Sequence, residues 1–158
     1  MQPACGSIGY LDIEPEDDYL NHIIRELHRS LNRALQARLT PYGISVPQWQ
    51  YMRVLWAQDG ITHRDLSIRT GMTEPTTSLA INILERRHLV QRVLDAGDHR
   101  KVSIYLTRQG HDLRDQLVSV GQDVEQEATA NIPQASLGTM FSVLRQIQDN
   151  LAETPENR

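Results

Sequence analysis

The sequence holds a single cysteine, Cys5, so no disulfide can form within one chain. It has no run of about 18 apolar residues that would span a membrane, and no basic segment followed by an apolar stretch that would direct secretion. These absences predict a cytoplasmic protein. Cys5 lies in residues 1–15, where glycine and proline interrupt any periodicity and a flexible arm is expected. No neighbouring base lowers the pKa of the thiol, so an incidental thiol is favoured over a redox sensor.

Signals for catalysis are also missing. None of the six histidines forms an H-x-x-x-H pair, and no cysteine accompanies them, so no metal site is expected. The sequence contains no G-x-S-x-G, P-loop or dinucleotide-binding fingerprint. Asp98 and His99 are adjacent, but neighbours along a chain rarely align as a catalytic pair. The expectation is therefore a non-enzyme without a cofactor.

The length of 158 residues suits one domain with a real core. The formal net charge is −4, yet it is unevenly spread. Residues 1–20 and 111–158 each carry −5, whereas residues 21–84 and 85–110 each carry +3. Binding to a charged partner depends on local patches of charge rather than on the net charge of the chain. The basic middle of the sequence is therefore compatible with a nucleic-acid partner.

Apolar periodicity predicts four longer helices. Residues 16–39, 108–130 and 136–151 each show apolar positions at spacings of three and four, typical of a packed helix face. Residues 47–58 are apolar nearly all round, which predicts a buried helix. Both tryptophans of the chain, Trp49 and Trp56, lie in that helix.

Between these segments, two short helices form a helix-turn-helix pattern. Thr62 starts the first, Gly71 ends it, and Thr73 caps the second, which runs from residue 74 to residue 88. Leu66 and Ile68 of the first helix are expected to face inward. In the second, Leu79, Ile83 and Leu84 are expected to anchor the core. Its opposite face is expected to hold Glu74, Pro75, Thr77, Ser78, Ile81 and Asn82, a set rich in the small hydroxyl side chains that approach base edges closely.

Residues 89–110 predict a β-hairpin. Val102, Ile104 and Leu106 alternate with polar residues, the signal of a half-buried strand. The turn over residues 95–98 has the composition that a hairpin needs, and the cations Arg100 and Lys101 follow it. The flanking pattern favours the wing of a winged helix-turn-helix over an ordinary hairpin with a solvated tip.

The predicted fold class is therefore mainly α with a small β-hairpin wing. Residues 46–107 are expected to form the winged helix-turn-helix lobe. Residues 16–45 and 108–152 are expected to form a helical dimerisation region. A twofold dimer suits DNA, since symmetric half-sites match a symmetric protein. A winged helix that serves only as a protein-interaction module remains the alternative, although such a module needs no cationic tip.

Arg53 interrupts the apolar helix at 47–58 and needs a partner or an opening to solvent. One interpretation is a pocket where Arg53 meets an anionic ligand against aromatic walls. The other, which is favoured, is an internal pair with a carboxylate beside core tryptophans.

The hairpin and its surroundings resemble the MarR family of bacterial transcription regulators. The residues that carry the resemblance are the D-x-R…L-T-x-x-G pattern of Asp98, Arg100, Leu106, Thr107 and Gly110, and upstream Asp65-Leu66, Gly71, Thr76-Thr77, Leu84-Glu85 and Leu89-Val90. The resemblance implies a homodimer, a wing arginine in a minor groove, and a recognition helix in the major groove of a pseudo-palindromic operator. It also implies a repressor released by a small aromatic or phenolic acid, or its coenzyme A thioester. The family's thiol-based sensors carry a cysteine on the first long helix, and this chain has none there.

Under this resemblance Arg100 is the minor-groove residue and Asp98 positions the wing. The full set of expected DNA contacts is Arg64, Arg69, Thr73, Glu74, Pro75, Thr76, Thr77, Ser78, Asn82, Asp98, His99, Arg100 and Lys101. The effector is expected near His28, Trp49 and Arg53, which no motif assigns.

Overall fold

The computed structural model describes residues 19–94 and 102–152. The expected arm over residues 1–15 lies outside this range. The helices and strands are α1 (Tyr19–Leu39), η1 (Thr40–Tyr42), α2 (Val46–Ala57), β1 (Ile61–Thr62), α3 (His63–Thr70), α4 (Glu74–Arg86), β2 (Val90–Leu94), β3 (Val102–Leu106), α5 (Arg108–Asp112), α6 (Arg114–Leu117), α7 (Val120–Ala128) and α8 (Gln134–Ala152).

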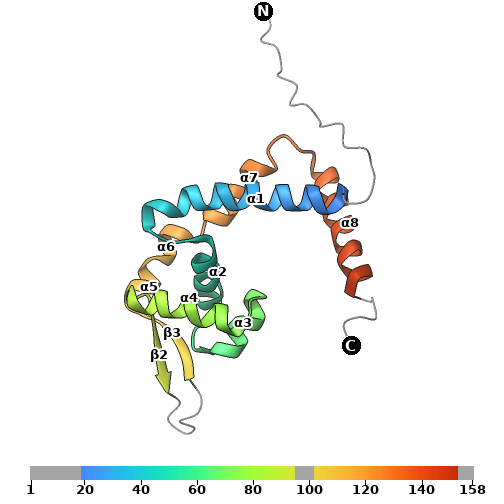
Figure 1. Ribbon diagram of the computed structural model, residues 1–158. Coiled ribbons are helices and arrows are strands. Elements are labelled where there is room, and N and C mark those ends of the chain that lie inside the picture. Colours follow the sequence, from blue (N-terminus) through green and yellow to red (C-terminus); the bar gives the residue numbers. More distant parts are fainter. Residues whose placement is uncertain (1–18, 95–101, 153–158) are drawn as a thin grey trace, which may run out of the picture.

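The elements form a lobe and a helical layer (Figure 1). The lobe contains α2, α3, α4 and the sheet, and it hangs below one end of α1. Helix α7 packs along α1, where Arg38 pairs with Glu127. Helix α8 lies at the other end of α1, away from the lobe (Figure 1). The mainly helical fold class with a β-hairpin wing is confirmed.

Helix α2 is the centre of the lobe, as its all-round apolar sequence predicted. Trp49, Tyr51, Met52 and Leu55 are all buried. The helix begins with a capping box, in which the Ser45 hydroxyl accepts from the Gln48 amide and the Gln48 side chain accepts from the Ser45 amide. This reciprocal cap satisfies amides at the helix start that have no partner within the helix.

The hairpin belongs to a three-stranded antiparallel sheet in the order β1-β3-β2. The short strand β1 was not predicted, because two residues are too few to show alternation. It pairs Ile61 with Ile104 of β3. Ile104 and Leu106 are buried, as the alternation in β3 predicted.

The predicted continuous helix over residues 108–130 is wrong, because the segment divides into α5, α6 and α7. An indole of α2 donates at each break. Trp56 Nε1 donates to the Gly110 carbonyl at 2.9 Å, and Trp49 Nε1 donates to the Leu117 carbonyl at 3.1 Å. In a continuous helix those carbonyls would accept from amides four residues later. The two tryptophans therefore hold the segment against the lobe in three pieces.

Apolar side chains remain on the surface of the helical layer. Tyr19, Leu20, Ile23, Ile24 and Leu27 of α1 are all exposed, and no residue of α8 within the described chain is buried. The apolar stripes predicted for both chain ends are therefore present, and they expose apolar side chains to solvent.

Gly110, the last residue of the L-T-x-x-G pattern, lies where no side chain fits. A Cβ at this position would come within 2.1 Å of the Leu89 carbonyl oxygen. The Thr107 hydroxyl accepts from the Gly110 amide at 3.1 Å and donates to the His88 carbonyl. The pattern thus joins the start of α5 to the chain entering β2.

We predict opposite effects for two glycine-to-alanine substitutions. Gly110→Ala should destabilise the protein by several kcal/mol, because a backbone carbonyl must move. Gly138→Ala should stabilise it by about 0.5–1 kcal/mol, since Gly138 lies inside α8 with open space around its Cα. Urea denaturation at one protein concentration measures both. Equal midpoints for Gly110→Ala and the unchanged protein would contradict the close packing of α5 on Leu89.

Candidate nucleic-acid interface

Helices α3 and α4 form the predicted helix-turn-helix. The Thr62 hydroxyl accepts from the Asp65 amide at 3.1 Å, and the Thr73 hydroxyl accepts from the Thr76 amide at 3.4 Å. Gly71 ends α3 with a φ of +67°, a conformation that glycine adopts without strain. These local signals place both helices within about two residues of their predicted bounds.

Most of the side chains predicted to contact DNA lie on the surface of this motif. The exposed ones are Arg64 and Arg69 of α3, the cap Thr73, and Glu74, Pro75, Thr76 and Asn82 of α4. Ser78 is half-buried. The motif thus presents cations on α3 beside the hydroxyl-rich first half of α4.

Thr77 is a correction. It was predicted to face DNA, but it is fully buried, and its hydroxyl lies 3.2 Å from the Tyr51 hydroxyl. Tyr51 is itself buried, and a buried phenol requires a hydrogen-bond partner. Thr77 supplies that partner, so it joins α4 to α2 and is not available to a ligand.

The faces of both helices are rotated relative to the prediction. The core side of α4 consists of Thr77, Ala80, Ile81 and Leu84. Ile68 on α3 and Leu79 on α4, both predicted to face inward, are 67% and 66% exposed. The sequence held two overlapping apolar stripes on α4, and the prediction chose the one through Leu79 and Ile83.

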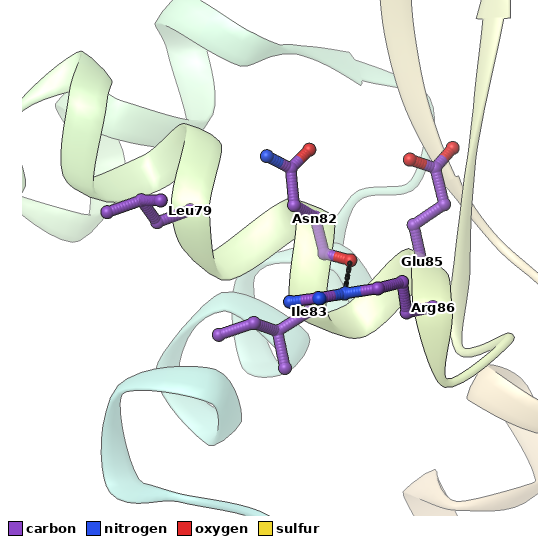
Figure 2. A pocket seen from close by; sticks show the side chains of 5 residues that line it. All are labelled: Leu79, Asn82, Ile83, Glu85 and Arg86. Atoms are coloured by element: carbon purple, nitrogen blue, oxygen red, sulfur yellow. Dashed lines mark hydrogen bonds between the residues drawn. The ribbon is translucent and has the colours of Figure 1, made fainter.

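Sequence reasoning therefore missed three surface residues of α4. Leu79, Ile83 and Arg86 line a shallow hollow of about 430 Å³ together with Asn82 and Glu85. Figure 2 shows Leu79 projecting away from the helix, and the Arg86 side chain folded back so that its Nε donates to the Asn82 carbonyl at 3.3 Å. On a helical wheel, placing Thr77, Ile81 and Leu84 toward the core puts the three missed residues on the exposed side.

The wing is braced against α4 by Arg92 of β2. Its guanidinium pairs with Glu85 and donates to Asn82 Oδ1 at 2.8 Å. The contact fixes the strand that leads to the tip relative to the surface of α4. The four predicted tip residues, Asp98, His99, Arg100 and Lys101, lie outside the described residues.

Arg53 lies on the surface between α2 and α3. Its guanidinium carbon is 4.8 Å from the centroid of the Trp49 ring, a cation–π arrangement. Arg53 and Arg69 line one hollow of about 430 Å³, which Gln50, Val54, Ala57 and Thr70 complete. Arg53 is exposed, so its charge is open to solvent. The favoured interpretation, an internal pair with a carboxylate, does not fit this exposed side chain.

The other two residues predicted near the effector lie elsewhere. His28 is exposed on α1, where its ring contacts the Asn32 amide at 3.1 Å, and it does not line the hollow at Arg53. Trp49 is buried beneath Arg53, and its Nε1–H donates to the backbone carbonyl of Leu117.

Within residues 19–94 and 102–152, no group of three or more His, Cys, Asp and Glu side chains is arranged to hold a metal ion. Over the same part of the chain, no helix combines the length and apolar character that crossing a bilayer needs.

Comparison with known proteins agrees with this geometry. The family model described as "MarR family" matches residues 44–102, which include α2, α3, α4 and the start of β3. The Staphylococcus aureus MepR–DNA complex superposes with a TM-score of 0.78 at 26% identity, covering 83% of this chain and 97% of MepR. The family model, the curated regulators and MepR together support a MarR-family winged-helix regulator.

Two curated relatives extend the comparison. The transcriptional regulator TtmR of Methylorubrum extorquens is 27% identical over 103 residues, or 65% of this chain and 53% of TtmR. The homoprotocatechuate degradative operon repressor of Escherichia coli is 27% identical over 93 residues, or 56% of this chain and 63% of the repressor. The matched region thus spans between half and two thirds of each relative. These relatives are named as regulators of transcription, which confirms the prediction of a non-enzyme.

We predict that Thr77→Val will destabilise the protein by about 1–3 kcal/mol, because the buried Tyr51 hydroxyl loses its partner. Adding Tyr51→Phe should restore part of the loss, since no polar group then remains unpaired. Thr76→Val, the same change on the exposed side, should stay within about 0.5 kcal/mol. The readout is urea denaturation. Additive effects of Thr77→Val and Tyr51→Phe would contradict a hydrogen bond between them.

Proposed function

We propose that this protein is a dimeric repressor that binds a pseudo-palindromic operator and is released by a small aromatic carboxylate. The observation that carries the DNA-binding part is the exposed face of α4, with its capped, hydroxyl-bearing first half beside the arginines of α3. Small hydroxyl groups and helix-start amides suit close contact with bases and phosphates. MepR, which shares this fold at 26% identity, was solved with DNA.

The wing completes the proposed interface. Arg92 holds β2 on α4, so the strand that leads into the wing has a defined place beside the proposed recognition helix. A narrow minor groove attracts arginine strongly, and a cation at a phosphate-rich edge adds affinity that falls with salt. From the sequence pattern we assign the groove contact to Arg100, supported by Asp98, with His99 and Lys101 beside it.

Dimer formation is supported by the uncovered apolar side chains at the two chain ends. Those of α1 include Ile23, Ile24 and Leu27, and those of α8 include Met140 and Phe141, all exposed. Contiguous apolar surface on a protein of this size marks an interaction site. A second copy would cover both helices by twofold symmetry and set two α4 helices about one DNA turn apart. In this proposal residues 16–45 and 108–152 form the dimerisation region, and residues 46–107 form the DNA-binding lobe.

Repression is proposed because one relative is named as a repressor, that of the homoprotocatechuate degradative operon. Release is assigned to the hollow at Arg53. Two guanidinium groups line it, Arg53 and Arg69, and its volume lies in the range of small-molecule sites. Arginine holds carboxylates in a bidentate geometry, so a small organic acid is the ligand that this charge pattern favours. Because Arg69 also belongs to the proposed DNA-binding face, one acid bound there would compete with a DNA phosphate.

We predict that Arg100→Ala weakens operator binding by about 1–3 kcal/mol. The matched control is Arg114→Ala, which removes the same charge from α6. Fluorescence anisotropy with the promoter region of the protein's own gene, at fixed salt, gives both affinities. Unchanged affinity in Arg100→Ala would remove the wing assignment. No binding by the unmodified protein to any duplex would instead favour a protein-interaction module.

A separate prediction concerns release. Arg53→Ala should bind the operator as the unmodified protein does, yet an aromatic carboxylate such as salicylate should no longer release it. Val54→Ala, beside it in the hollow, should retain release. Anisotropy of the protein–DNA complex during titration with salicylate measures this. Release at the same concentration in Arg53→Ala and the unmodified protein would eliminate Arg53 as the anchor.

A further inference from the structure

Helix α4 carries an apolar ridge on its exposed face. Thr76, Leu79 and Ile83 follow one another at spacings of three and four, so they lie on one side of the helix. Leu79 is 66% exposed and Ile83 is 36% exposed, and both line the hollow seen in Figure 2. The core face of α4 is completed by Thr77, Ile81 and Leu84, so the packing of the lobe does not require a leucine at position 79.

The surroundings of this ridge are polar and cationic. Arg86 closes the hollow at the end of the helix, and the exposed hydroxyl of Thr76 lies one turn before Leu79. Asn82 accepts from Arg92 through its side-chain oxygen, while its amide nitrogen remains a donor group. Glu85 is neutralised by its pair with Arg92. A small apolar surface with a positive rim is complementary to a polyanion that presents a small apolar group.

The DNA major groove presents one such group. Guanine, cytosine and adenine offer hydrogen-bond donors and acceptors there, whereas thymine adds its C5 methyl group. Leu79 is the sixth residue of α4, within the half of a recognition helix that contacts base edges. Resting on the proposed DNA-binding function, we propose that Leu79 contacts a thymine methyl group in each operator half-site and that Ile83 packs behind it.

This assignment makes Leu79 a specificity-determining residue. Contacts between the neighbouring arginines and phosphates add affinity for DNA of any sequence. Leu79 adds affinity only where a thymine methyl group fills the hollow beside it. The operator half-site should therefore contain a thymine opposite the middle of α4. Replacing that thymine with deoxyuridine removes the methyl group and leaves every hydrogen-bonding group of the base pair in place.

The test uses the full-length protein and a duplex that it selects from a randomised 30-base-pair library. Each thymine of the selected duplex is replaced singly by deoxyuridine, and Kd is measured at fixed salt for the unmodified protein and for Leu79→Ala. Alanine favours the helical state, and circular dichroism verifies that the variant is folded.

At one thymine per half-site, the deoxyuridine substitution should weaken binding by the unmodified protein about fourfold, the factor for burying one methyl group. Leu79→Ala should bind the unsubstituted duplex several-fold more weakly and should not distinguish thymine from deoxyuridine. The effects on Kd should thus be non-additive at that thymine alone.

Two results would overturn the inference while leaving DNA binding intact. One is a selected duplex in which no deoxyuridine substitution weakens the unmodified protein, a measurement that needs no variant to fold. The other is equal sensitivity to deoxyuridine in Leu79→Ala, which would leave the ridge as a surface for another protein. Failure to select or bind any duplex would instead refute the proposed function itself.

Discussion

Two indole hydrogen bonds join α2 to the segment from α5 to α7, and the arrangement of the lobe against the helical layer depends on them. Trp56 donates to the carbonyl of Gly110 and Trp49 to that of Leu117, so one buried helix ties the segment from α5 to α7 at two points. The same helix reaches α4 through the contact between Tyr51 and Thr77. Buried polar groups are costly when unpaired, so these three contacts must be made together. The position of α4 relative to the segment from α5 to α7 is therefore set within the core.

Much of the lobe follows from local sequence signals. The caps at Thr62 and Thr73 and the glycine at position 71 mark helix bounds through backbone chemistry that acts within a few residues. The alternation in β3 predicts its buried face, because side chains in a strand point to opposite sides in turn. The MarR-family resemblance shares Gly71 and Leu106 with these local signals.

Other features were not predictable because they depend on partners far along the chain. Thr77 resembled a surface hydroxyl until the buried Tyr51 was placed beside it, 26 positions earlier. The breaks after α5 and α6 arise from tryptophans more than fifty residues away. On α4, both candidate apolar stripes have helical spacing, so periodicity alone could not distinguish the core from the ridge at Leu79. These cases share one cause. The local sequence pattern shows which residues lie on one face of a helix, but it does not show which distant residues pack against that face.

The hollow at Arg53 and the face of α4 share Arg69 as a near neighbour, so proposed effector and DNA contacts lie on adjoining parts of the lobe. A compact lobe can then respond to a ligand without a long relay between distant sites. Small changes at the surface suffice where two binding regions use the same charged side chain.

The chain has two tryptophans, and both lie where α2 meets the segment that leads to the helical layer. All of its indole fluorescence therefore originates at that junction. A displacement of this segment from α2 would break one or both indole hydrogen bonds and shift the emission wavelength. The protein thus contains an intrinsic optical probe of this junction, and its integrity can be followed in solution without attaching a dye.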